Sequence, residues 1–316
     1  MPKPTGKYKL PHPEPLDALV HARSGGIATF TRLPHIPQPE ELDVALLGIP
    51  FDGGTTYRPG ARFGPRHVRQ QSVLIRPWNP VLNLNPFMKY RIGDYGDFSV
   101  NPLSIEDTFR RVEEQMQPLL SSGTRCVSVG GDHSLSLPLL RAIVKKYGPV
   151  ALIQFDAHND LWDQYFGCKY SHGTPFRRAI EEGLILAGCF LQVGLRGQVY
   201  SRHDFDFARK NKVRMITAEE FHAGGLPLFR KQLAAFRGKR VYVTLDIDCV
   251  DPAFAPGTGT PQVGGFTSAQ IVDLVRALRG LRIVGCDLVE VSPPYDTGEI
   301  TSLLAANLLY ELLCVL

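Results

Sequence analysis

The chain of 316 residues lacks several features that would each assign it to a particular class of protein. Its six cysteines form no C-x-x-C pair and mostly lie within apolar runs, which argues against a disulfide framework or a zinc ribbon. We therefore expect reduced, buried thiols. No apolar run reaches membrane-spanning length, and no block of Lys and Arg indicates nucleic acid. We expect neither a membrane nor a nucleic acid as partner.

The first 40 residues lack the apolar core of a signal peptide and begin with several Pro and Lys residues. We expect an N-terminal arm and loop over residues 1–40, in a cytoplasmic protein or, if a transit peptide has been removed, a mitochondrial-matrix protein. Hydrophobic residues make up 44% and charged residues 21% of the chain, which is typical of a globular protein with a full core. No linker divides the sequence, so we predict one domain over residues 1–316.

Apolar runs alternate with helical patterns along most of the chain. Strands are expected at 41–49, 126–129, 150–155, 190–193, 241–246 and 282–291. Helices are expected at 65–73, 104–117, 135–147, 174–182, 204–210, 268–278 and 300–315. The alternation predicts an α/β fold of three layers, α/β/α, with a mostly parallel central sheet. Ligands of such sheets bind beyond the carboxyl ends of the strands.

One stretch, P-V-A-L-I-Q-F-D-A-H-N-D from Pro149 to Asp160, joins an apolar run directly to ionisable side chains. Asp156, His158 and Asp160 alternate after that run, and in extended backbone alternate side chains point the same way. Three ionisable groups gathered at the end of a buried strand would repel and desolvate one another. A bound cation is the simplest remedy, so the stretch predicts a metal site.

Two further segments place similar side chains at expected strand ends: G-G-D-H-S with His133, and D-I-D with Asp246 and Asp248. A lone motif of this kind is often a helix cap, a turn or a salt-bridged rim, so the metal prediction depends on all three segments. Together they offer four carboxylates and two imidazoles, a donor set that suits a divalent metal such as Mn²⁺. Six ligands exceed what one tetrahedral site needs, whereas two metals with bridging carboxylates would use them all.

These three segments, with four others, resemble the motifs of the arginase/agmatinase (ureohydrolase) family. The others are G-T-T-Y-R-P-G-A-R-F-G-P (54–65), S-H-G-T-P-F (171–176), D-P-A-F-A-P-G-T-G-T-P (251–261) and E-V-S-P-P-Y-D (290–296). The resemblance runs from about Leu42 to the C-terminus and favours the agmatinase-like branch, which includes guanidinobutyrase, guanidinopropionase and proclavaminate amidinohydrolase. It implies an arginase-like fold and a hydrolase that acts on the C–N bonds of linear amidines.

The resemblance also implies two Mn²⁺ ions per subunit, for which Ni²⁺ and Co²⁺ are alternatives, and a metal-bridging hydroxide that cleaves a guanidinium group into urea and an amine. One metal would take His133, Asp156, Asp160 and Asp246. The other would take Asp156, His158, Asp246 and Asp248, so that Asp156 and Asp246 bridge. The family's usual assembly implies a homo-oligomer, either a trimer or a hexamer.

Three residues are expected to be catalytic. Asp160 would accept a hydrogen bond from the attacking hydroxide and orient it. His172 would pass a proton to the leaving amine; its rival interpretation is a simple turn residue before Gly173. Glu290 would anchor the planar guanidinium by charge-assisted hydrogen bonds, and its rival interpretation is a structural ion pair near a strand end.

The substrate is predicted as a small linear guanidino compound, either a guanidino acid such as 4-guanidinobutyrate or agmatine. Asn159 and Trp162 depart from the family pattern, and Trp162 either lines the pocket or packs behind its loop. Arg76 and Arg196 could meet a carboxylate tail, although structural pairing is the alternative for each. Two other functions stay open: a guanidine hydrolase with a smaller pocket, and a catalytically silent homologue that acts as a binding or regulatory subunit.

Overall fold

The computed structural model describes residues 13–316; residues 1–12, the start of the expected N-terminal arm, lie outside the described residues. Eight strands form one sheet in the order β2-β1-β3-β8-β7-β4-β5-β6, and every neighbouring pair is parallel. The strands are β1 (Val44–Gly48), β2 (Ile92–Asp97), β3 (Arg125–Val129), β4 (Val150–Phe155), β5 (Ile185–Leu195), β6 (Arg214–Thr217), β7 (Arg240–Asp246) and β8 (Arg282–Val289). The predicted parallel sheet is confirmed.

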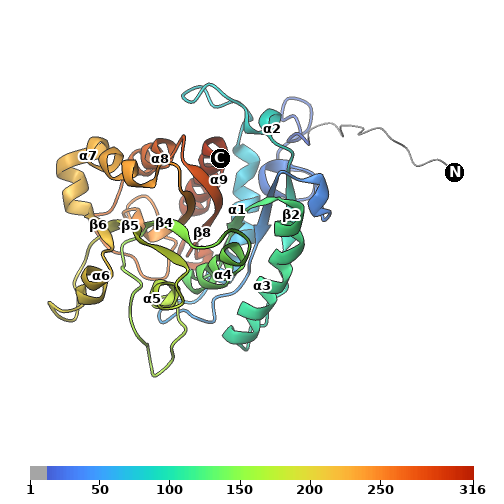
Figure 1. Cartoon of the computed structure of the whole chain (residues 1–316). Coiled ribbons are helices and arrows are strands. Elements are labelled where there is room, and N and C mark those ends of the chain that lie inside the picture. The colour runs from blue at the N-terminus through green and yellow to red at the C-terminus, as the bar shows by residue number, and fades with distance from the viewer. Residues whose placement is uncertain (1–12) are drawn as a thin grey trace.

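Helices cover both faces of this sheet (Figure 1). One layer contains α1 (Gly64–Gln71), α7 (Ala218–Leu233), α8 (Ser268–Ala277) and α9 (Ile300–Val315), whose apolar residues share one core cluster. The other contains α3 (Ile105–Ser122), α4 (Ser136–Tyr147), α5 (Pro175–Glu181) and α6 (Asp206–Lys210), which share a second cluster. A short helix, α2 (Pro86–Lys89), precedes β2. The three predicted layers are therefore confirmed.

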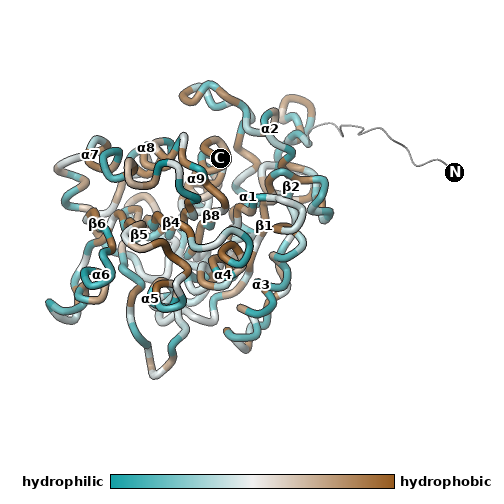
Figure 2. The backbone as a smooth tube through the Cα atoms, in the orientation of Figure 1, coloured by the Kyte–Doolittle hydropathy of each residue, from teal (hydrophilic) through white to brown (hydrophobic). Residues whose placement is uncertain are grey.

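The central strands carry hydrophobic side chains on both faces because helices cover both faces. All six residues of β4 are buried, and so are seven of the eight residues of β8. Figure 2 shows the same distribution: hydrophobic residues are concentrated at the sheet, and hydrophilic residues lie mainly on the outer helices and loops. A core of this kind holds the strand ends rigidly, which is what a preorganised site requires.

Several elements differ from the sequence prediction. The helix expected to end near Pro118 continues to Ser122, because Pro118 lies on the exposed face and Gly123, in the left-handed region, ends the helix instead. The strand expected at 190–193 is longer, as β5. Strands β2 and β6 and helix α7 were not predicted. The last contains Gly225 in a non-helical conformation and Pro227, which hide its helical pattern.

Four neighbouring strands, β3, β8, β7 and β4, form the middle of the sheet.

In the described part of the chain, no helix is long and apolar enough to cross a membrane.

Candidate active site

The six predicted ligands and Glu290 all lie at or just beyond the carboxyl ends of the four central strands. His133 follows β3, and Asp156, His158 and Asp160 follow β4. The remaining residues belong to the other two strands: Asp246 ends β7, Asp248 follows it, and Glu290 comes directly after β8. The structure therefore brings together side chains that are up to 157 residues apart in sequence.

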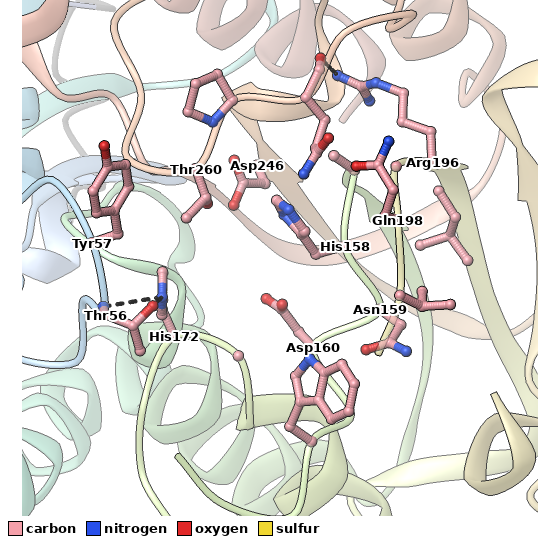
Figure 3. Close-up of a pocket in the computed structure, with 18 of the residues that line it drawn as sticks. Thr56, Tyr57, His158, Asn159, Asp160, His172, Arg196, Gln198, Asp246 and Thr260 are labelled. Carbon is pink, nitrogen blue, oxygen red and sulfur yellow. Dashed lines mark hydrogen bonds between the residues drawn. The ribbon is translucent and has the colours of Figure 1, made fainter. Parts of the chain in front are cut away.

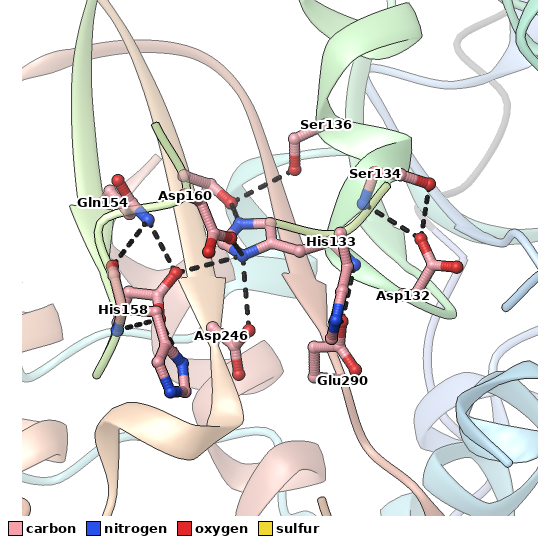
Figure 4. Close-up of polar contacts among 12 residues, drawn as sticks. Asp132, His133, Ser134, Ser136, Gln154, His158, Asp160, Asp246 and Glu290 are labelled. Atoms are coloured by element: carbon pink, nitrogen blue, oxygen red, sulfur yellow. Dashed lines mark hydrogen bonds and ion pairs between the residues drawn. The ribbon is translucent and has the colours of Figure 1, made fainter. Parts of the chain in front are cut away.

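His133 stands at the centre of one cluster (Figure 4). Its Nδ1 atom lies 3.1 Å from Asp156 Oδ2, 3.0 Å from Asp160 Oδ2 and 3.2 Å from Asp246 Oδ2. All four side chains are buried, yet none of the described residues offers this nitrogen a well-aligned hydrogen bond. Three carboxylate oxygens converging on one imidazole nitrogen match a cation-binding donor set.

His158 forms a second cluster on the other side of Asp156. His158 Nδ1 lies 3.0 Å from Asp248 Oδ2 and 3.6 Å from Asp156 Oδ1. Asp156 thus presents one carboxylate oxygen to each histidine. Ligand atoms of His133, Asp156 and Asp160, and likewise of Asp156, His158 and Asp248, lie within 4.8 Å of one another, close enough for each set to hold a metal ion. Asp246 belongs to the first cluster through Oδ2, while its Oδ1 accepts a hydrogen bond from the backbone N–H of Asp248 at 2.8 Å.

The carboxylates of both clusters create a local excess of negative charge that favours a bound positive charge. Burial alone lowers the pKa of His133, but Asp156, Asp160 and Asp246 raise it well above its usual value. Likewise, burial lowers the pKa of His158, and Asp248 and Asp156 raise it well above normal. Burial and the charge of Asp156 raise the pKa of Asp160 to about 6. These residues fit divalent cations, which would supply the charge that bound protons otherwise supply.

Beside the clusters, Glu290 connects His172 to His133. Glu290 Oε1 accepts a hydrogen bond from the backbone N–H of His133 at 2.8 Å and lies 3.1 Å from His172 Nδ1. Glu290 Oε2 is buried and has no hydrogen-bond partner among the described residues. A buried carboxylate oxygen left unpaired costs free energy, so this atom is suited to accept N–H groups from a ligand.

His172 is fixed on its other side by the 54–65 segment. His172 Nε2 lies 2.7 Å from Thr56 Oγ1 and 3.1 Å from the backbone nitrogen of Thr56 (Figure 3). Burial lowers the pKa of His172, but Glu290, Asp160 and Asp132 raise it to about 9. Cations among those carboxylates would oppose this rise and bring the pKa back toward neutrality.

Two site residues have unusual backbone conformations. Asp160 has φ of 49° and Glu290 has φ of 65°, values that side chains other than glycine rarely adopt. Such conformations cost free energy and persist only where the surrounding structure imposes them, frequently at functional sites. Glu290 directly follows β8, and Asp160 lies five residues beyond the end of β4, where its carboxylate faces His133 Nδ1.

A cavity of about 830 Å³ opens onto the clusters through His158, Asp160, His172 and Asp246. Trp162 also lines it, so the structure places this residue at the pocket. The indole packs edge-on against Tyr165 and Tyr200, with ring centroids 6.1 and 5.4 Å away. Asn159 lines the cavity as well, whereas Glu290 is not among the lining residues. Figure 3 shows the labelled polar side chains around this space.

The basic residues near the cavity differ in what they contact. Within the described part of the chain, Arg196 donates hydrogen bonds only to backbone carbonyls and so holds the loop after β7 in place. The acceptors are the carbonyls of Gly194, Asp248, Cys249, Val250, Gln262 and Val263. Arg76 is exposed and does not line the cavity. Arg58 does line it and, among the described residues, forms no ion pair or side-chain hydrogen bond. Its guanidinium lies over the rings of Tyr57 and Tyr295, at 5.3 and 5.2 Å.

Sequence reasoning missed several residues that support the site from the strands. Thr244 contacts His133 from β7, and Gln154 in β4 donates to Asp156 Oδ2 at 2.6 Å. Asp287 lies within β8 and accepts from Thr244. Polar residues inside otherwise apolar strand runs were the available signal, most clearly Asp287 in R-I-V-G-C-D-L-V.

Comparison with known proteins gives consistent relationships. The family model described as Arginase family matches residues 42–314. The chain is 48% identical to guanidinobutyrase and 49% identical to guanidinopropionase, both of Pseudomonas aeruginosa, each over 96% of both chains. Among solved structures, proclavaminate amidino hydrolase from Streptomyces clavuligerus is 42% identical with a TM-score of 0.88, covering 93% of this chain and 98% of that one.

Proposed function

The chain belongs to the Arginase family, and from this premise we propose that it hydrolyses a guanidino acid to urea and an amine at a centre of two metal ions. Enzymes of this kind are hydrolases that act on the C–N bonds of guanidino compounds. The observation that carries the proposal is the pair of clusters around His133 and His158, which share Asp156. We further propose that residues 1–316 act as a single domain with an N-terminal arm.

In this proposal, His133, Asp156, Asp160 and Asp246 hold one Mn²⁺, and His158 and Asp248 join Asp156 and Asp246 at the other. Their nitrogen and carboxylate donors support Mn²⁺, and Ni²⁺ and Co²⁺ suit the same set. When bound, such a pair supplies Lewis acidity and lowers the pKa of a water molecule toward neutrality.

The protein's own residues would then guide the reaction. Glu290 Oε2 accepts N–H groups of the guanidinium and fixes its plane. Asp160 accepts a hydrogen bond from the attacking water and aligns its oxygen with the guanidinium carbon. As the C–N bond to the tail breaks, His172 gives a proton to the leaving nitrogen. The two hydrogens of the attacking water then restore the proton on His172 and complete the ammonium group, so that urea and a protonated amine are formed.

The cavity supports a substrate with an anionic tail. Of the described residues that line it, only Asp160 and Asp246 are acidic, and both belong to the clusters. Away from them, residues 13–316 place no carboxylate in the wall for the ammonium group of agmatine, whereas Arg58, which forms no ion pair within this part of the chain, offers a cation. The named activities of the two Pseudomonas aeruginosa relatives support the same choice. A volume of about 830 Å³ far exceeds the size of free guanidine, which disfavours the guanidine hydrolase alternative.

A panel assay of urea release tests the proposal. Protein loaded with Mn²⁺ is incubated with 4-guanidinobutyrate, 3-guanidinopropionate, agmatine, arginine and guanidine, with and without a chelator. We expect urea from at least one guanidino acid, and its loss on chelation. A folded, metal-loaded protein that releases urea from none of these compounds would instead support the silent homologue.

The ligand assignment has its own test. His158→Ala should remove one of two bound Mn²⁺ ions and reduce turnover by roughly 100-fold or more, because it deletes the only imidazole of the second cluster. Elemental analysis of the purified variant gives the stoichiometry. Two bound ions and full turnover in this variant would refute the assignment.

Assembly and location are proposed from the family resemblance. We propose a homo-oligomer, trimer or hexamer, which light scattering of the purified chain would test. We also propose a cytoplasmic or mitochondrial-matrix location, which imaging of the tagged full-length protein would test.

A further inference from the structure

A buried hydrogen-bond relay runs from the first cluster into the sheet. His133 Nε2 lies 2.7 Å from Thr244 Oγ1, and Thr244 Oγ1 lies 2.5 Å from Asp287 Oδ1. Thr244 and Asp287 are fully buried and His133 is 1% exposed, so water does not compete for these contacts. The relay links β7 and β8 to the histidine that follows β3, and it lies on the side of the imidazole opposite the carboxylate cluster.

Burying the carboxylate of Asp287 costs free energy. Its carboxylate accepts from Ser136 Oγ at 2.9 Å, from the hydroxyl of Tyr242 at 2.7 Å and from Thr244. No Lys or Arg forms an ion pair with it among the described residues. An ion pair therefore does not explain why a carboxylate stands in the middle of an apolar strand, where burial without a counter-charge is costly.

The chemistry of the three groups fixes the direction of the hydrogen bonds. A carboxylate can only accept, so the single hydroxyl proton of Thr244 goes to Asp287. Thr244 Oγ1 then has only lone pairs left for His133, and Nε2 must carry the proton that it accepts. The lone pair of the neutral imidazole consequently resides on Nδ1, the atom that faces Asp156, Asp160 and Asp246.

We infer that Thr244 and Asp287 are positioning residues that fix the tautomer and ring orientation of His133, so that Nδ1 is presented as a metal ligand. The inference rests on the proposed metal centre and deepens it. A carboxylate behind a ligating histidine makes the imidazole a better donor, and here the hydroxyl of Thr244 carries this effect across one further residue. Among the described residues, no side chain holds His158 Nε2 in the same way.

Metal binding tests the relay without reference to turnover. Apoprotein of the wild type, Thr244→Val, Thr244→Ser and Asp287→Asn is titrated with Mn²⁺, and affinity and stoichiometry are measured by calorimetry. Thr244→Val keeps the shape and removes the hydroxyl, so we expect one of the two ions to bind roughly 10- to 100-fold more weakly. Thr244→Ser keeps the hydroxyl and should restore affinity. Asp287→Asn should weaken binding as Thr244→Val does, because its amide can donate to the threonine and reverse the relay.

A matched control separates the relay from general damage to the core. Ser128 is a buried residue of β3 whose hydroxyl donates to the carbonyl of Cys286 and, within residues 13–316, forms no hydrogen bond with His133. Ser128→Ala should bind both ions as the wild type does. Circular dichroism of each apoprotein establishes folding, and if Thr244→Val does not fold, the decision passes to Asp287→Asn and Thr244→Ser.

The outcomes distinguish the relay from the metal centre itself. Wild-type affinity in folded Thr244→Val, or in folded Asp287→Asn if that variant decides, would overturn the inference. Equal weakening in Ser128→Ala would also overturn it. If the wild type binds no Mn²⁺, the proposed metal centre fails, and not the relay alone.

Discussion

Glu290 has one carboxylate oxygen fixed by the protein and the other without a partner. Oε1 is held by the backbone of His133 and by His172, while Oε2 is buried and unpaired. A residue held in this way is preorganised for one more donor group. As a guanidinium anchor, Glu290 would need Oε2 to bind the substrate, whereas in a structural ion pair Oε2 would not contact the substrate. A substitution of Glu290 can separate these two roles.

Glu290→Gln should lower kcat/KM by roughly 10- to 150-fold, because a hydrogen bond to a charged partner is worth about 1.5–3 kcal/mol. The loss should be similar for every guanidino compound hydrolysed, since all of them share the guanidinium. Steady-state kinetics with two substrates of different tail length measure it. Unchanged kinetics in a folded variant would leave Glu290 with a structural role only.

Arg58 leads to the opposite pattern, because it would contact the tail and not the guanidinium. Arg58→Ala should raise KM for 4-guanidinobutyrate roughly 10-fold or more, through loss of a charge-assisted hydrogen bond, and leave any activity on agmatine unchanged or improved. Arg66 is an exposed arginine of the same segment, so Arg66→Ala is the matched control. An equal loss on both substrates would show that Arg58 supports the loop and does not select the tail.

The ionisable residues at the strand ends could be predicted from the sequence, whereas the residues that hydrogen-bond to them from within the strands could not. Asp156, His158 and Asp160 stand out because ionisable side chains alternate directly after an apolar run. Thr244 was hidden because a threonine is ordinary in a strand and its contact with His133 joins positions 111 residues apart. For Arg76 and Arg196 the sequence left a tail contact and structural pairing open, and the contacts of Arg196 with backbone carbonyls fit structural pairing.

At the scale of elements, the loop between β4 and α5 carries both residues of the metal clusters and aromatic residues that line the cavity. Asp160 lies five residues past the end of β4, Trp162 and Tyr165 line the cavity from this loop, and His172 lies near its end. The conformation of this loop therefore sets the distance between the reacting groups and the part of the cavity that would hold the substrate tail. The sequence alone left open whether Trp162 packs or lines the pocket, because Tyr200, which packs against its indole, comes from another loop.

Trp162→Ala should change the ratio of kcat/KM values for 4-guanidinobutyrate and 3-guanidinopropionate by roughly 10-fold, since one methylene in a fitted pocket is worth about 1–3 kcal/mol. Enlarging the wall should favour the longer tail. The only other tryptophan, Trp78, is 53% exposed and is not among the residues that line the cavity, so Trp78→Ala provides the control. An unchanged ratio would mean that the indole only supports the loop.

The elements that prediction missed share a physical reason. Strand β2 reads I-G-D-Y-G-D, and its glycines and aspartates indicate a turn unless a neighbouring strand is known. It forms because β1 pairs with it along the edge of the sheet. The central strands were predictable because burial on both faces makes them continuously apolar, a pattern that an edge strand does not need.

For the whole molecule, the buried clusters couple metal binding to folding. The unfolded chain has no preformed site, so cations that bind the native state stabilise it. Mn²⁺ at about 100 times its dissociation constant contributes about 2.7 kcal/mol per site, which should raise Tm by roughly 5 to 10 °C for two sites. Thermal unfolding with Mn²⁺, with a chelator and after re-addition of Mn²⁺ measures this. His158→Ala should show only part of the rise, and an equal rise in both proteins would contradict the two-site proposal.

The separation between strand ends and loops has a consequence for how such a protein can change over generations. The cluster residues and Glu290 lie at or just past the carboxyl ends of the four central strands, whereas Arg58, Trp162, Tyr165 and Tyr200 lie farther out on the connections. Substitutions in those connections can alter the preferred tail without disturbing the reacting groups. Libraries randomised only at the cavity-lining loop positions should therefore yield folded hydrolases with new substrate preferences far more often than libraries randomised at the strand ends.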